Sequence, residues 1–128
     1  MCYNRIYNEQ EVQTMIDYWL EKYEGQQLEL FRNHGNPYET IIIRIQLDEQ
    51  ELYVGDEEIE HGPDGGSSMR ILSFDKENTR KAFSALSRQG RDPVDALKAM
   101  LNAKERLAPL HKLCQENNIE YTNKLHFG

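Results

Sequence analysis

The stretch Tyr38–Gly55, YETIIIRIQLDEQELYVG, contains the strongest strand pattern in the chain. In its first part, Tyr38–Leu47, apolar residues occupy alternate positions, which is the period of a β-strand with one buried face. That face carries Ile41, Ile43, Ile45 and Leu47. Asp48–Glu51 is short enough for a tight connection to a second strand, Leu52–Gly55. The opposite face carries Ile42, Arg44 and Gln46, and it is either partly solvated or in contact with a partner.

Strand patterns also lie on both sides of this stretch. Gln27–Asn33 precedes it across the turn His34–Pro37, and Met69–Phe74 follows it across Gly62–Ser68. Glycine, proline, aspartate and serine in these connections are typical turn residues. A last strand is predicted within Ile119–Phe127. The chain is therefore expected to contain an antiparallel sheet of three to five strands.

Helical periodicity appears before the strands. From Val12 to Tyr23 the apolar residues recur every three or four positions, as in an amphipathic helix. Asn8 followed by Glu11 resembles a capping box. Gly25 is a plausible end of the helix.

Helical periodicity returns after the strands. Asp75 can cap a helix over residues 76–89, and Asp92–Pro93 is a strong start signal for another over residues 93–108. Pro109 either kinks this second helix or starts a last short one. All 128 residues are therefore predicted to form one α+β domain. In it, the N-terminal helix and a C-terminal helical hairpin pack on one face of the antiparallel sheet.

The charge is unevenly distributed. The chain has 22 acidic and 15 basic side chains, and its net charge is −7. No lysine or arginine lies between Arg44 and Arg70, whereas this stretch holds eight carboxylates. They are Asp48, Glu49, Glu51, Asp56, Glu57, Glu58, Glu60 and Asp64. This acidic segment, residues 48–64, is the candidate partner-binding site, and its carboxylates are expected to be unpaired.

Unpaired carboxylates steer and orient association with a basic surface. The sequence therefore predicts a non-enzymatic binding protein of inhibitor, immunity or regulatory type that engages a basic protein surface. One such partner is a nucleic-acid-binding protein: the carboxylates would mimic the phosphates of a nucleic-acid backbone and occupy the site where the partner binds them. Small size and acidity are also typical of bacterial immunity proteins and phage-encoded inhibitors, which is an argument by analogy.

Other interpretations of the acidic segment stay open. The charge can simply keep a solvated loop soluble. A calcium site would also use carboxylates, but the spacing differs from that of an EF-hand loop. His61 with Glu58, Glu60 and Asp64 could hold a transition metal. A solvated histidine among acids is the simpler interpretation, so no metal and no cofactor is predicted.

The alternative function is a small-ligand-binding protein or a small enzyme whose site is assembled by the fold. Its candidates are Arg44, Glu58, His61 and His111, but no catalytic signature supports them, and no catalytic residue is assigned. Cys114 shares an apolar face with its neighbours and is predicted to be a buried structural thiol.

A secondary basic patch lies on the second predicted helix and at its exit. It consists of Arg80, Lys81, Arg88 and Arg91. The helix–turn–helix arrangement here would need base-reading residues at the start of the next helix, where DPVDALKAM offers acidic and apolar ones. Direct nucleic-acid binding is therefore not expected. The opposite charges of the two halves are compatible with a homo-oligomer.

The expected location is the cytoplasm. No apolar run is long enough for a transmembrane helix, and the first residues do not resemble a signal peptide. Membrane binding is not expected. Cys2 and Cys114 are therefore interpreted as free thiols, and Tyr3 and Tyr7 are expected to pack on the core.

Overall fold

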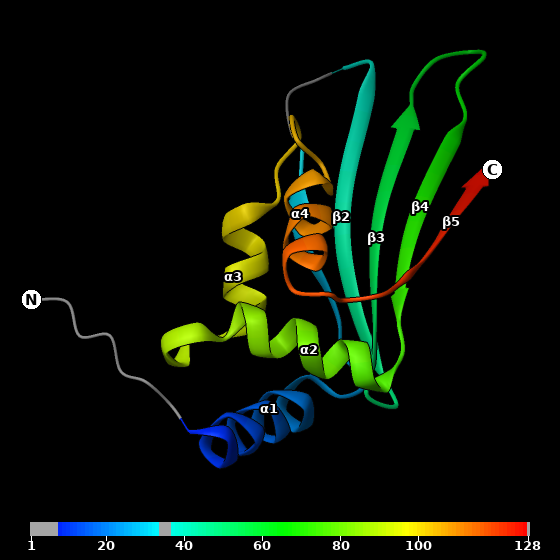
Figure 1. Cartoon of the computed structure of the whole chain (residues 1–128). Helices are drawn as coiled ribbons and strands as arrows, with labels where there is room; N and C mark the ends of the chain where they lie inside the picture. The colour runs from blue at the N-terminus through cyan, green and yellow to red at the C-terminus, as the bar shows by residue number, and fades with distance from the viewer. Residues whose placement is uncertain (1–7, 34–36, 128) are drawn as a thin grey trace, which may run out of the picture.

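Five antiparallel strands form one open sheet in the order β1–β2–β3–β4–β5 (Figure 1). This computed structural model describes residues 8–33 and 37–127. The strands are β1 (Gln27–Arg32), β2 (Glu39–Asp48), β3 (Glu51–Glu60), β4 (Ser67–Phe74) and β5 (Thr122–Phe127). The predicted α+β fold with an antiparallel sheet is confirmed.

The helices pack on one side of the sheet, with α1 beside α2 (Figure 1). They are α1 (Glu9–Tyr23), α2 (Lys76–Leu86), α3 (Pro93–Met100) and α4 (Ala108–Glu116), and a single 3-10 turn, Arg88–Gly90, follows α2. The predicted C-terminal hairpin is thus three helices. In the part of the chain that the structure describes, no helix is long and apolar enough to cross a bilayer.

The strand predicted over Leu52–Gly55 was too short. It was expected to end at Gly55, but β3 continues to Glu60, because residues 56–59 pair with both β2 and β4 and Glu60 pairs with β2. Glu58, for example, lies between Ile41 of β2 and Ser68 of β4. Acidic residues favour strands only weakly, and pairing with two neighbours outweighs this preference. Most carboxylates of the acidic segment therefore belong to the sheet and not to a loop.

The predicted helix over residues 93–108 was too long. It ends at Met100, because Asn102 directs the chain into a tight loop. The Asn102 side chain accepts hydrogen bonds from the backbone N–H groups of Lys104 and Glu105, which competes with helix formation. Arg106 closes the loop with its N–H on the Asn102 carbonyl, in a left-handed conformation with φ of 58°.

The core lies between the sheet and the helices. The strands bury Ile43, Ile45, Leu47, Leu52, Val54, Leu72 and Phe74 there, against Ala82, Phe83, Leu86, Leu97, Leu110 and Cys114 of the helices. The prediction of a buried thiol is confirmed, and burial raises the pKa of Cys114 to about 11. On the opposite, helix-free face, Ile42 is also buried, at 2% exposure. It lines a shallow depression of about 90 Å³ together with Tyr53, Gly55 and Ile71.

Candidate functional site

The two ends of the acidic segment lie at opposite ends of the sheet. Asp48, Glu49 and Glu51 flank the β2–β3 turn, whereas Asp64 lies in the β3–β4 loop. Between them runs the ten-residue strand β3, which spans roughly 30 Å. The turn is held by Glu24, whose carboxylate accepts the backbone N–H groups of residues 49 and 50. The acidic segment is therefore not one continuous surface.

The alternation of β3 separates its own carboxylates. Asp56, Glu58 and Glu60 face the helices, whereas Glu57 faces the other way. On that helix-free face Arg44 Nη1 lies 3.0 Å from Glu57 Oε1. The expectation that these carboxylates are unpaired was wrong for Asp56 and Glu57. Asp56 pairs with Arg106 of a distant loop, and Glu57 pairs with Arg44 of the neighbouring strand β2. A count of charges along the segment reveals neither partner.

Asp56 forms the most buried ion pair that the structure shows. It is 7% exposed, and Arg106 reaches it from the loop before α4. Arg106 Nε lies 2.9 Å from each carboxylate oxygen, and Nη2 lies 2.6 Å from Oδ1. Burial has the largest single effect on the pKa of Arg106 and lowers it, but the hydrogen bonds to Asp56 and the charges of the nearby carboxylates together outweigh burial and raise the pKa above its ordinary value. This pair fastens the loop to the sheet.

Beyond Asp56, two carboxyl groups of adjacent strands approach each other. Glu39 of β2 and Glu58 of β3 are diagonal neighbours on the helix-facing side. A hydrogen bond between the two carboxyl groups raises the pKa of Glu39, with smaller effects of burial and of the Glu58 charge. Arg106 opposes this shift but does not cancel it. Negative charge is therefore in excess at this end of the sheet.

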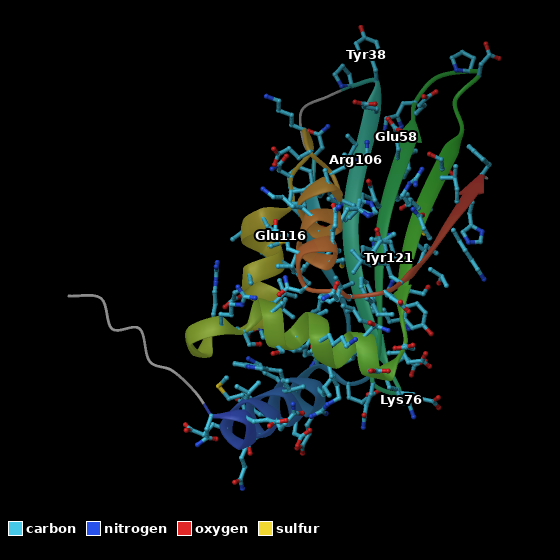
Figure 2. All side chains as sticks on the ribbon, in the orientation of Figure 1. Tyr38, Glu58, Lys76, Arg106, Glu116 and Tyr121 are labelled. Carbon is cyan, nitrogen blue, oxygen red and sulfur yellow. The ribbon has the colours of Figure 1, made fainter. Side chains whose placement is uncertain are left out.

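The same side of the sheet also exposes two large apolar side chains. Leu125 is 47% exposed and Phe127 is 80% exposed. Cross-strand partners share a face, and Phe127 pairs with Ser68, which in turn pairs with Glu58. Phe127 thus stands about 10 Å, or two strand spacings, from Glu58. We call this surface the uncovered corner, comprising Glu39, Glu58, Glu60, Ser68, Leu125 and Phe127; Glu58 is labelled in Figure 2.

Leu125 and Phe127 were not among the surface residues predicted from the sequence. A signal was present, because apolar residues alternate in the last predicted strand. Alternation shows that a strand has two different faces, but it does not show whether a helix covers the apolar one. Tyr38, next to Glu39 and 77% exposed, was also missed.

The residues proposed for an assembled catalytic site are not brought together. Arg44 and Glu58 lie on opposite faces of the sheet. His61 Nε2 lies 2.7 Å from Thr40 Oγ1 at the end of β3. His111 lies on α4, where burial, and secondarily the Arg70 charge, lowers its pKa.

Metal binding receives no support from the described residues, in which no group of three or more histidine, cysteine, aspartate or glutamate side chains could hold an ion. This includes His61 with Glu58, Glu60 and Asp64. The expectations for Cys2, Tyr3 and Tyr7 lie outside the described residues.

The secondary basic patch is partly assembled by the fold. Arg80, Lys81 and Arg88 line one groove of about 570 Å³ between α1 and α2, whereas Arg91 is not part of its lining. The groove and the uncovered corner are each built by several elements.

Comparisons of the chain with protein-family models, with curated proteins and with solved structures found no match.

Proposed function

We propose that this chain is a non-enzymatic binding protein that docks onto a basic surface of a partner protein through the uncovered corner. One observation carries the proposal: Leu125 and Phe127 stand exposed in the same cross-strand rows as Asp56 and Glu58. Protein interfaces typically combine a few apolar or aromatic anchors with a polar rim. The corner offers both components within two strand spacings.

Solubility alone does not account for this surface. Carboxylates by themselves would suit a solvated sheet edge. An exposed phenylalanine lowers solubility, because its contact with water is unfavourable. Burying such a side chain contributes about 1.5–3 kcal/mol of favourable free energy. A partner that covers Phe127 gains this contribution, and the carboxylates accelerate and orient its approach.

The charge of the corner favours a cationic partner. Glu39 and Glu58 share a hydrogen bond when one of the two carboxyl groups keeps its proton, and the charge of Glu58 adds to the rise in the pKa of Glu39. A lysine or arginine side chain placed between them would supply the missing charge. This supports an inhibitor or regulatory role toward a protein whose own activity needs a basic surface, such as a nucleic-acid-binding protein.

Two variants test the proposal against matched controls. We expect Glu58→Lys and Phe127→Ala each to weaken binding of the partner about tenfold or more, because they remove a charge contact and an apolar anchor. The controls are Glu116→Lys at the end of α4 (Figure 2), which makes the same charge change, and Tyr18→Ala on α1, which removes another exposed aromatic. Proteins captured from the native lysate by the immobilised wild type would be purified and titrated against all four variants by calorimetry. A partner that binds Glu58→Lys and Glu116→Lys equally well would refute the proposal.

Lowering the pH is expected to weaken the same interaction. The pKa of Glu39 is raised, first by its hydrogen bond to Glu58, so Glu39 regains its proton at a higher pH than an ordinary glutamate. A protonated carboxyl attracts a cationic side chain less strongly. The partner's affinity, measured over a pH series at constant ionic strength, should therefore begin to fall above the ordinary titration range of glutamate. The Glu39→Gln variant should lose this early part of the fall; if its profile matches that of the wild type, Glu39 is not involved.

A further inference from the structure

Side chains of α1 and α2 line a groove. Figure 1 shows that these two helices lie at the other end of the molecule from the C-terminal end of β5, which carries part of the uncovered corner. Ser84 and Ala85 of α2 contribute small side chains to the groove. Gln13 and Ile16 of α1 line one side, and Asn117, just after α4, lines another. Its volume of about 570 Å³ falls within the range of binding clefts, roughly 300–1,000 Å³. The small side chains would let another chain approach α2 closely.

The groove carries positive charge in a chain whose net charge is −7. Arg80 is neutralised by α1, since its Nη1 lies 2.8 Å from Asp17. Arg88 instead donates to the neutral amide of Asn117 at 2.7 Å, and no carboxylate of the described residues forms an ion pair with it. Lys81 has a loose contact at 3.9 Å with Glu77, an exposed carboxylate of the same helix that also lines the groove. Arg88 and Lys81 are therefore available to an anionic ligand.

The spacing of these two cations indicates the kind of ligand. Lys81 lies on α2, and Arg88 begins the 3-10 turn that follows this helix, so the two residues stand roughly 10 Å apart along the direction of the chain. Two carboxylates two turns apart on another helix have the same separation. The residues lining the groove include no aromatic side chain, so a nucleobase would find nothing on which to stack.

We infer that this groove binds an acidic helical segment of a partner protein, lying along α2 with two of its carboxylates on Lys81 and Arg88. Such helix-in-groove docking is a common mode of peptide recognition. The inference is independent of the proposed function, because it involves other residues and the opposite charge. The chain would then have two docking surfaces, one for a basic partner and one for an acidic partner.

A synthetic peptide tests this inference directly. The probe is a fluorescein-labelled helical peptide of alanine, leucine and glutamine that carries two glutamates two turns apart, and binding is followed by fluorescence anisotropy at low salt. The comparison peptide has glutamine in place of both glutamates. We expect the full chain to bind the first peptide more tightly, and Lys81→Glu and Arg88→Glu each to weaken that binding about tenfold. Lys98→Glu, which makes the same charge change on α3 outside the groove, should leave it unchanged.

Each remaining outcome has a defined meaning. If Lys98→Glu weakens binding of the acidic peptide as much as Lys81→Glu and Arg88→Glu do, the effect is one of net charge and the inference is overturned. Equal binding of the two peptides by the wild type would also overturn it. Displacement of the peptide by an equal concentration of inorganic phosphate would identify a small-anion site instead. Lys81→Glu keeps the test decisive if Arg88→Glu, which also loses the Asn117 contact, fails to fold. Glu58→Lys should bind the acidic peptide like the wild type, which separates this surface from the uncovered corner.

Discussion

Replacing Arg106 with methionine is expected to lower the free energy of unfolding by about 3–5 kcal/mol. The substitution leaves the Asp56 carboxylate at 7% exposure without the three hydrogen bonds that Arg106 donates to it. A buried charge that loses its partner retains its full desolvation penalty. The same substitution releases the loop over residues 101–107, which Arg106 fastens to the sheet. Urea titration followed by circular dichroism measures the loss.

Arg44→Met is the matched control for this prediction. Arg44 pairs with Glu57, the residue next to Asp56, but on the helix-free face and through one hydrogen bond. The two side chains are 33% and 21% exposed, so water replaces much of what the pair loses. We expect a loss of about 1 kcal/mol or less. Equal losses for the two variants would show that burial of Asp56 does not set the effect.

A double substitution separates the ion pair from its burial. In Asp56→Leu combined with Arg106→Met, no charge stays buried, so most of the stability lost in Arg106→Met should return. A protein in which a buried ion pair is replaced by apolar residues of similar volume is often at least as stable as the original protein. If the double variant is as unstable as Arg106→Met, the loop itself, and not the uncompensated charge, is responsible.

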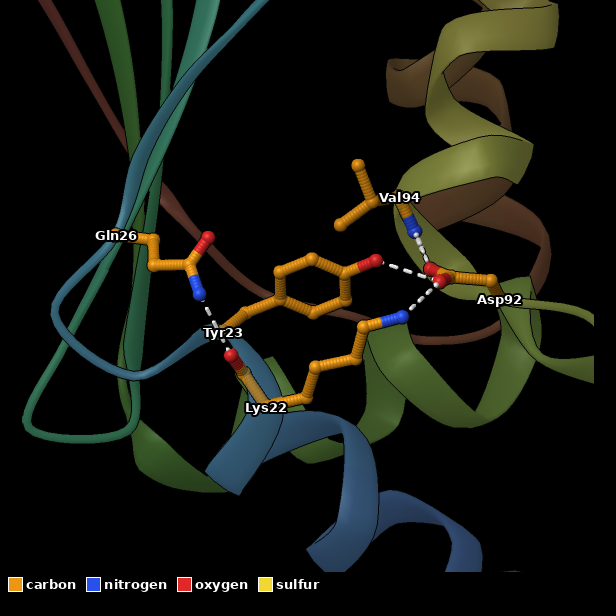
Figure 3. Close-up of polar contacts among 5 residues, drawn as sticks. All are labelled: Lys22, Tyr23, Gln26, Asp92 and Val94. Atoms are coloured by element: carbon orange, nitrogen blue, oxygen red, sulfur yellow. Dashed lines mark hydrogen bonds and ion pairs between the residues drawn. The ribbon is translucent and has the colours of Figure 1, made fainter.

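Replacing Asp92 with alanine is expected to cost about 2–4 kcal/mol, since one carboxylate serves three donors. Asp92 Oδ1 accepts the N–H of Val94 at 2.8 Å and so caps α3, as Figure 3 shows. Its Oδ2 accepts the hydroxyl of Tyr23 at 2.5 Å and lies 3.2 Å from Lys22 Nζ. The substitution therefore removes a helix cap and also detaches α1 from α3. Thermal unfolding and urea titration both report it.

Asp75→Ala provides the comparison. Asp75 caps α2 in the same way, through the N–H of Asn78, but its bonds stay within its own helix start. We expect its loss to be near 1 kcal/mol, the typical value of a cap. A difference between the two variants measures the tie from Asp92 to α1. Equal values would contradict a stabilising role of the Tyr23 hydroxyl.

The hydrogen bond from Tyr23 to Asp92 also predicts a loss of stability at high pH. Burial, and then the hydrogen bond to Asp92, raises the pKa of Tyr23 from 10.0 to about 12. The folded state thus holds this proton more tightly than the unfolded state, so the contribution is complete below pH 10 and is lost as the pH rises toward 12. Tyr23→Phe should show a smaller loss over this window. A similar loss in the variant would assign it to other groups.

Local signals in the sequence predicted much of the fold. Asn8, Asp75 and Asp92 each cap the helix expected of them, because a cap involves residues within one turn. The alternation from Thr40 to Leu47 likewise identified β2 and its two faces, since each side chain's direction follows from its place in the strand.

The tertiary structure decided the features that depend on distant residues. Gly55 looked like a strand end until pairing with β2 and β4 extended β3 to Glu60, because a sheet ladder takes its hydrogen bonds from neighbouring strands. Asp56 looked unpaired because Arg106 lies fifty positions further along the chain. Whether Phe127 is covered depended on where the helices pack. The sequence by itself thus determined the periodicity and caps of most elements, whereas the packing of these elements determined which charges are neutralised and which surfaces stay open.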